Sequence, residues 1–212
     1  MNDRAAKLKA FIRSFDVTAV MAIEILDVVV IMLIGLWVFL PAMLPNSAAV
    51  VFGGGRPMDG GRTIKGRRIL GDGKTWRGFF GGAAAGIVLG LILMGISYIF
   101  DPDGLWGYGT LWKGLGVIIC LSFGSLLGDI MGSFIKRRLG IERGKKAPIL
   151  DQFDFVIGAF LLTALFFPRW VYGTYIEGWH IVALIFLLIV TLLLHRAMNI
   201  IGYKAGLKDV PW

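Results

Sequence analysis

The chain has 212 residues, of which 57% are hydrophobic and 17% charged, and a formal net charge of +8. An apolar share this far above the roughly 45–50% of soluble domains argues against an ordinary soluble fold. We expect the positive charge to lie in loops that face anionic headgroups and anionic substrates, and we expect no nucleic-acid partner.

Five segments are long or apolar enough to cross a membrane: residues 17–44, 78–100, 114–135, 155–168 and 176–194. The fourth is short, so it crosses about 30 Å of hydrocarbon only by recruiting a residue at one end. The sequence therefore predicts an all-α fold, a polytopic membrane protein with about five transmembrane helices. We expect residues 1–212 to form a single integral-membrane domain.

Two connections carry most of the positive charge. Residues 45–77 hold seven Lys and Arg residues, and residues 136–146 hold six. The two alternate connections hold only Lys113 and Arg169. The positive-inside rule therefore predicts two basic cytoplasmic loops, an outside N-terminus and a cytoplasmic C-terminus. Four basic residues before the first segment argue for the opposite orientation, but they are fewer and partly offset by acids.

Aromatic residues gather on the side opposite the basic loops. They are Trp106, Tyr108, Trp112, Trp170, Tyr172, Tyr175 and Trp179. Because Trp and Tyr are enriched where a helix leaves the hydrocarbon, these residues predict an outer aromatic belt.

Glycines recur every four residues on two of the predicted helices: Gly78, Gly82, Gly86 and Gly90 on the second, and Gly124, Gly128 and Gly132 on the third. Small residues at this spacing let helix backbones approach closely. We expect the second and third helices to pack together, which would bring Lys74 near Asp129.

Three aspartates lie at the ends of apolar segments. Asp129 is near the end of the third segment, and Asp151 and Asp154 open the fourth with i, i+3 spacing. Carboxylates are costly in hydrocarbon, so they persist there mainly for pairing, metal binding or transport. Ser133 and Lys136 follow Asp129 on the same helical face. This pattern predicts that the three aspartates bind Mg²⁺, with two ions held against a polyphosphate. In the alternative interpretation, the acids only pair with neighbouring basic side chains.

The first basic loop ends in Lys74, Thr75 and Arg77, which we expect to bind phosphates from the cytoplasmic end of the second helix. The alternative is a flexible basic loop that faces lipid. Asn46, just past Pro45, has the chemistry to bind a base edge or a ribose. Glu24 and Asp27 in the first segment could line a polar cavity or pair inside the bundle.

Several of these residues form a known pattern. The run GDIMGSFIKRR followed by PILDQFDF resembles the signature of the membrane phosphatidate cytidylyltransferases. The matching positions are Asp129, Ser133, Lys136, Arg137, Asp151 and Asp154. The run GDGKTWRGFFGG resembles a second stretch of that family, with Arg77 in place of its glutamate. Gln152 replaces an arginine of the family, and the shorter loops resemble those of its archaeal branch, the CDP-archaeol synthases.

The resemblance implies an enzyme of phospholipid biosynthesis that transfers CMP from CTP to an unsaturated archaeal ether-lipid phosphate, giving CDP-archaeol and pyrophosphate. It implies a site on the cytoplasmic side of the cell membrane. Its catalytic residues would be Asp129, Asp151, Asp154 and Lys136, and its nucleotide-binding residues Lys74, Thr75, Arg77, Ser133 and Arg137. Asn46, chosen for its own chemistry, is added to the expected nucleotide-binding set. The magnesium ligands would be the three aspartates.

Two other functions fit part of the pattern. A CTP-dependent polyprenol kinase would use a similar site but transfer the γ-phosphoryl group and release CDP. An anion or nucleotide transporter would also explain basic loops and intramembrane acids, although such proteins often contain internal repeats and this sequence shows none.

Overall fold

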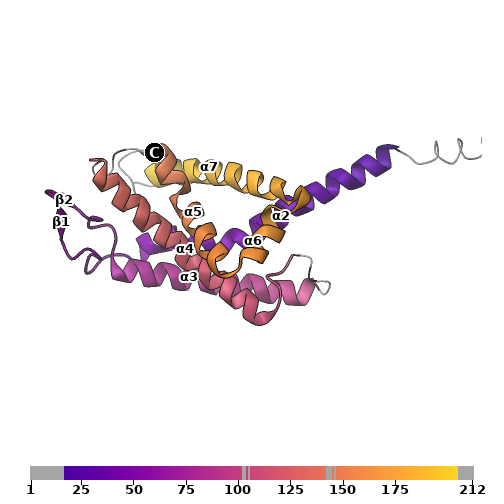
Figure 1. Ribbon diagram of the computed structural model, residues 1–212, viewed down its shortest axis with the longest axis horizontal. Coiled ribbons are helices and arrows are strands. Elements are labelled where there is room, and N and C mark those ends of the chain that lie inside the picture. Colours follow the sequence, from indigo (N-terminus) through magenta and orange to yellow (C-terminus); the bar gives the residue numbers. More distant parts are fainter. Residues whose placement is uncertain (1–16, 102–103, 105, 142–144, 146, 205–212) are drawn as a thin grey trace, which may run out of the picture.

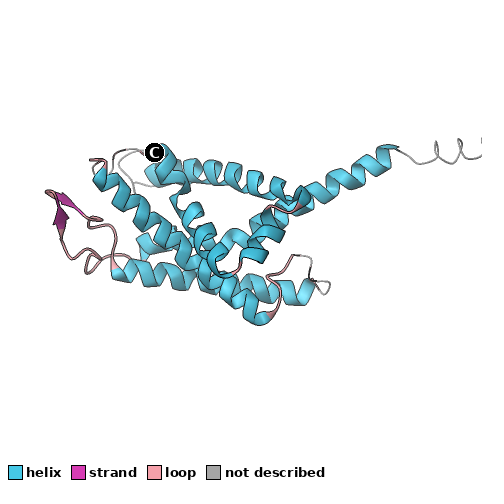
Figure 2. Ribbon diagram, in the orientation of Figure 1, coloured by secondary structure: helices cyan, strands magenta, loops and turns pink. Residues whose placement is uncertain are grey.

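The computed structural model describes residues 17–101, 104, 106–141, 145 and 147–204. Most of these residues are helical (Figures 1 and 2). The elements are α2 (Val17–Val51), α3 (Trp76–Phe100), α4 (Leu111–Arg138), α5 (Pro148–Phe166), α6 (Pro168–Tyr175), η1 (Gly178–His180) and α7 (Ile181–Lys204). Two short strands, β1 (Thr63–Ile64) and β2 (Arg67–Arg68), pair antiparallel in the loop before α3. The predicted helical membrane architecture is therefore confirmed in its broad form.

Among the described residues, three helices are long and apolar enough to cross a membrane: Ile25–Val51, Trp76–Phe100 and Leu111–Arg138. A fourth candidate combines Pro168–Tyr175 with Gly178–Leu194, which are bent by 85° relative to each other. The predicted fifth segment, residues 176–194, corresponds to the second part of this pair, and the bend lies at its start, after α6. The count of five spans remains a prediction.

The first helix runs beyond its predicted end at Leu44 and reaches Val51, despite containing Pro41 and Pro45. Pro45 has no backbone N–H, so it leaves the carbonyl of residue 41 without its helical donor. The Ser122 hydroxyl of α4 donates to that carbonyl oxygen at 3.3 Å. Neighbouring helices commonly compensate prolines in this way within membranes.

The glycines of α3 pack mainly against α2 rather than α4. A Cβ at Gly82 would lie 2.5 Å from the carbonyl oxygen of Pro45, and one at Gly78 would lie 2.7 Å from that of Ala49. Only the later glycines reach α4, as at Gly90, where a Cβ would meet Ile118. The expected contact between the second and third predicted helices, α3 and α4, is confirmed, but the glycine spacing did not indicate that α2 covers most of the α3 glycines.

The glycines of α4 pack against α5. A Cβ at Gly124 would lie 2.7 Å from the carbonyl oxygen of Gly158, and one at Gly128 would meet the backbone of Asp154. This close approach brings the start of α5 directly against the C-terminal half of α4. The acidic end of α5 is consequently held beside Asp129 and Lys136.

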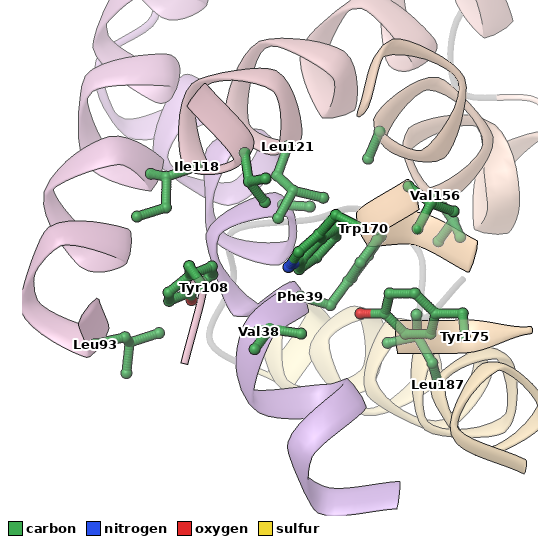
Figure 3. Packing of buried hydrophobic residues seen from close by; sticks show 14 of the residues in the cluster. Val38, Phe39, Leu93, Tyr108, Ile118, Leu121, Val156, Trp170, Tyr175 and Leu187 are labelled. Carbon is green, nitrogen blue, oxygen red and sulfur yellow. The ribbon is translucent and has the colours of Figure 1, made fainter. Parts of the chain in front are cut away.

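Figure 3 shows the core, in which α6 folds back against α2. Tyr175 is 1% exposed, and its hydroxyl donates to the Gly35 carbonyl oxygen at 2.7 Å. The Phe39 and Phe160 rings stack with centroids 5.0 Å apart, and Tyr175 contacts both edge-on. The predicted aromatic belt is thus wrong for the buried residues Tyr108, Trp170 and Tyr175, while Trp112 and Trp179 are exposed as expected. The turn after α5 directs α6 into the core.

Candidate active site

The loop between α2 and α3 is organised by a buried carboxylate. Asp59 accepts hydrogen bonds from the backbone N–H groups of Gly61, Leu70 and Gly71 at 3.0 Å, and from the Arg68 guanidinium at 2.7 and 3.2 Å. Its side chain is 0% exposed. Arg68 and the N–H groups outweigh burial and hold the pKa of Asp59 well below its usual range. These hydrogen bonds give the loop a defined conformation, which argues against the flexible loop considered as an alternative.

The end of this loop fixes Lys74 at the start of α3. Met58 donates its N–H to the Lys74 carbonyl oxygen at 2.7 Å, and Pro57 bridges to Thr75. Thr75 is the N-cap of α3, and its hydroxyl oxygen accepts from the Gly78 N–H at 3.1 Å. Capping satisfies a backbone donor that the first helical turn leaves without a partner, so Thr75 has a structural role in the ligand-free protein.

Lys74 forms an ion pair with Asp129 of α4. The two side chains are 25% and 23% exposed, so both charges are largely removed from solvent. The predicted proximity of Lys74 and Asp129 is confirmed.

This ion pair lies in the wall of a pocket of about 370 Å³, a volume that includes its open mouth. The lining residues are Asn46, Ala49, Val50, Met58, Gly73, Lys74, Thr75, Gly78, Phe79, Leu126, Asp129 and Ile130. Three helices and the loop therefore converge on one polar pocket, which contains four of the residues predicted from the sequence.

Asp154 of α5 lies against α4, where its carboxylate contacts the position of Gly132. It is close enough to interact electrostatically with Asp129, Lys74 and Lys136. Within the described part of the chain, no cation forms an ion pair with Asp154. Its carboxylate is thus next to the Lys74–Asp129 pair and available to a cation.

Asp151, one helical turn earlier, is paired. The Lys136 ammonium donates to its carboxylate at 2.6 Å, and the Ala147 N–H donates at 2.9 Å. The pairing considered as an alternative, of the acids with Lys136, Arg137 or Arg138, is therefore observed for Asp151, whereas Asp129 pairs with Lys74 instead. Each pair joins a lysine of the predicted site to an aspartate of the predicted metal-binding set.

The described residues contain no group of three His, Cys, Asp or Glu side chains that could together hold one metal ion. Magnesium, however, usually takes one or two protein carboxylates and completes its shell with water and substrate phosphates. Asp129 and Asp154 supply such an all-oxygen pair. The donor set fits magnesium shared with a polyphosphate, and it does not form a complete protein cage.

Three other predicted residues lie apart from the pocket lining. Ser133 is buried on α4, one turn after Asp129, and Arg77 is exposed on the first turn of α3. Arg137 donates to the carbonyl oxygens of Leu70 at 3.4 Å and Ile141 at 2.5 Å. It lines a second, basic cleft with Arg67 and Arg68. The structure therefore does not bring Arg77 and Arg137 into the pocket.

The two acids of the first segment do not join the site. Asp27 is exposed on the N-terminal part of α2, which extends away from the other helices (Figure 1). The prediction that Asp27 lines a cavity or pairs inside the bundle is thus wrong for the described residues, none of which forms a helix packed on that part of α2. The side chain of Glu24 lies outside the described residues.

Sequence reasoning missed Asp59 and Phe79. Asp59 is the acidic residue of the GGGRPMDGG run. Its presence in a loop with many basic residues was the feature of the sequence that could have indicated its role. Phe79 lines the pocket from α3, but nothing in the sequence distinguishes it from the other apolar residues of that helix.

The fold and the pocket define a class: a helical membrane enzyme whose lysine and carboxylate pairs suit a polyphosphate substrate. A family model described as CarS-like, CDP-archaeol synthase, matches residues 25–212. The chain belongs to this family. It is 51% identical to the CDP-archaeol synthase of Methanospirillum hungatei over 179 residues, which are 82% of this chain and 99% of the relative. It is 46% identical to that of Picrophilus torridus, with 87% and 98% covered.

A solved structure is also similar to the chain. It is described as an intramembrane enzyme for archaeal membrane lipids biosynthesis, and it is 39% identical with a TM-score of 0.61. The match covers 78% of this chain and 92% of the solved one. The resemblance found in the sequence is confirmed, and with it the prediction of a membrane cytidylyltransferase of archaeal lipid synthesis.

Proposed function

We propose that the chain transfers CMP from CTP to 2,3-di-O-geranylgeranylglycerol 1-phosphate, giving the CDP-activated ether lipid and pyrophosphate. Family membership supports the reaction. Within the structure, the observation that carries the proposal is the Lys74–Asp129 ion pair in the wall of an open pocket, next to the available carboxylate of Asp154.

The two ion pairs prepare the site for its ligands. In the ligand-free protein, Lys74 and Lys136 neutralise Asp129 and Asp151. In the presence of CTP, Lys74 and Lys136 would donate to phosphate oxygens in place of these carboxylates. Asp129 and Asp151 would then be available to hold magnesium. Because the largely buried charges of Lys74, Asp129 and Lys136 would keep an opposite partner in both states, the site would avoid the cost of an unpaired charge.

Asp129, Asp151 and Asp154 are the proposed ligands of Mg²⁺, with two ions as the expected number. Bound magnesium would supply positive charge that stabilises the leaving pyrophosphate. Lys74 and Lys136 donate to the phosphates, and Asn46 and Thr75 contact the nucleotide from the pocket wall. Ser133, Arg77 and Arg137 complete the proposed nucleotide-binding set from outside that wall.

The chemical step needs no protein base. The second pKa of a phosphate monoester is about 6, so the lipid phosphate is mostly dianionic at neutral pH. One of its oxygens attacks the α-phosphorus of CTP while the bond from the α-phosphorus to the bridging oxygen of the β-phosphate breaks. Pyrophosphate leaves with the bonding electrons. The residues of the chain contribute orientation and charge stabilisation.

We also propose a topology of five spans, with the fourth in α5 and the fifth in the bent α6–α7 unit. The N-terminus is outside, and the C-terminus and active site are cytoplasmic. Support comes from contacts between the two basic loops: the Arg138 guanidinium donates to the carbonyl oxygens of Ile64 and Arg68 at 3.0 and 2.8 Å. Both loops therefore lie at the same end of the molecule, beside the β1–β2 hairpin in Figure 1.

The products test the reaction. Purified protein in lipid would be incubated with CTP labelled separately in the α- and γ-phosphates, with magnesium, and with an ether-lipid phosphate or a polyprenol. The proposal predicts α-label in the lipid and γ-label in pyrophosphate. Release of CDP with γ-label in the alcohol would instead identify a kinase. Protein that retains CTP unchanged with every acceptor would contradict both enzymatic readings.

A further inference from the structure

The pocket contains a buried hydrogen-bond acceptor without a partner. Asn46 of α2 lines the pocket, and its side-chain oxygen Oδ1 is shielded from solvent. No donor in the described part of the chain forms a hydrogen bond with this oxygen. Buried side-chain polar atoms are paired in the large majority of cases, because an unpaired one loses its contact with water without compensation. The orphan oxygen indicates a ligand group that donates to it.

The fold holds Asn46 in this position. Helix α2 continues without a break through Pro45, so Asn46 keeps a fixed direction instead of belonging to a loose helix end. The glycines at 78 and 82 let α3 approach the carbonyl oxygens of Ala49 and Pro45 on the same part of α2. The carboxamide is therefore enclosed between α2 and α3, within the pocket that Asp129 lines from α4.

The side chains that line the pocket fall into a polar set and an apolar set. Its polar side chains are Asn46, Lys74, Thr75 and Asp129. Lys74 and Asp129 carry the charges suited to phosphates and a cation, and the Thr75 hydroxyl caps α3. The other side chains, from Ala49, Val50, Met58, Phe79, Leu126 and Ile130, are apolar and suit the flat faces of a heterocycle. Asn46 is thus the neutral polar side chain that can form a hydrogen bond with the edge of a base.

We propose that Asn46 Oδ1 accepts a hydrogen bond from the exocyclic 4-amino group of cytosine and thereby selects CTP over UTP. The inference rests on the proposed function, because it assumes that the triphosphate lies at Lys74 and Asp129. Uracil has a carbonyl oxygen where cytosine has the amino group, so UTP places one acceptor against another. A site built to hydrogen-bond a substrate group rejects an analogue without it, because its own buried group remains unpaired.

The test measures kcat/KM for CTP and for the triphosphate of 2-pyrimidinone riboside, which lacks only the 4-amino group. Wild-type protein should prefer CTP by about 10- to 100-fold, the effect of one buried hydrogen bond. Asn46→Ala should reduce this preference to about one, with most of the loss in the CTP value. Asn46→Asp keeps an acceptor at this position and should keep the preference, even if the added charge lowers both values. Ser47→Ala, an exposed neighbour on α2, is the matched control and should behave as wild type.

The outcomes separate the inference from the proposed function. If wild-type protein makes no CDP-lipid from CTP, both fail. If it makes CDP-lipid but Asn46→Ala lowers both kcat/KM values equally, Asn46 is only structural and the inference alone is overturned. A preference that survives in folded Asn46→Ala protein also overturns it. If the melting temperature of Asn46→Ala protein is lowered, the same kcat/KM ratio is measured for Asn46→Leu. Loss of the preference for CTP in that variant would support the inference, and its retention would refute it.

Discussion

Replacing Lys74 by Ala perturbs the pocket at the point where the loop meets α4. The substitution removes the ammonium group that pairs with Asp129 and that we expect to bind a phosphate of CTP. Because both partners are about three-quarters buried, with 25% and 23% exposed, the effect should exceed the 0–1 kcal/mol typical of surface pairs. A hydrogen bond to a charged group contributes about 1.5–3 kcal/mol, which corresponds to roughly 10- to 150-fold.

The assay for Lys74→Ala compares kcat/KM for CTP, kcat/KM for the lipid phosphate at saturating CTP, and direct CTP binding. The loss should appear in CTP use and far less in the lipid value. Arg62→Ala is the matched control, since it removes an exposed cation of the same loop whose side chain has no hydrogen bond or ion pair among the described residues. If Lys74→Ala leaves CTP binding and turnover unchanged, or if Arg62→Ala is equally impaired, the reasoning on this pocket is wrong.

Three further predictions concern the loop, the helix packing and the topology. Asp59→Asn should lower the melting temperature by the equivalent of about 2 kcal/mol, because Arg68 loses its buried counter-charge. The folded-state pKa of Asp59 is depressed, so this difference should be full above its ordinary value of 3.8 and shrink as pH falls below it; a pH-independent difference would contradict the argument. Gly128→Ala should destabilise the protein and reduce turnover, whereas Gly95→Ala, with nothing within 4 Å of its new Cβ, should not; equal melting temperatures would exclude tight α4–α5 packing there. In a Cys120→Ala background, cysteines at Arg62 and Lys145 should be labelled from the cytoplasmic side and one at Gly104 from outside; labelling of Arg62 and Lys145 from opposite sides would refute the topology.

The sequence predicted the helical segments and the acidic residues of the site well, because hydropathy and charge are local properties. Residues 78–100 and 114–135 lie within α3 and α4, and Lys74 does meet Asp129. Helix partners were not predictable in the same way. A glycine spacing defines a smooth face, but which helix covers it depends on the whole packing arrangement.

Other features depended on contacts between distant residues. Helix α2 passes Pro45 because Ser122, far along the chain, donates to the freed carbonyl. Asp59 became visible as the centre of its loop only when Arg68 and the N–H groups of residues 61, 70 and 71 closed around it. The burial of Tyr175 likewise follows from the turn that sends α6 back to α2, which composition alone does not indicate.

The central claim is that the carboxylates of Asp129 and Asp154 support nucleotidyl transfer at this pocket. The most direct measurement is CDP-lipid formation, with magnesium, by Asp129→Asn and Asp154→Asn proteins whose melting temperatures match wild type. Each change keeps the side-chain shape but removes the negative charge, and cation binding stabilises the transition state by several kcal/mol. The account predicts at least a roughly thousandfold loss of kcat in both variants. Near-normal turnover in either folded variant would contradict it.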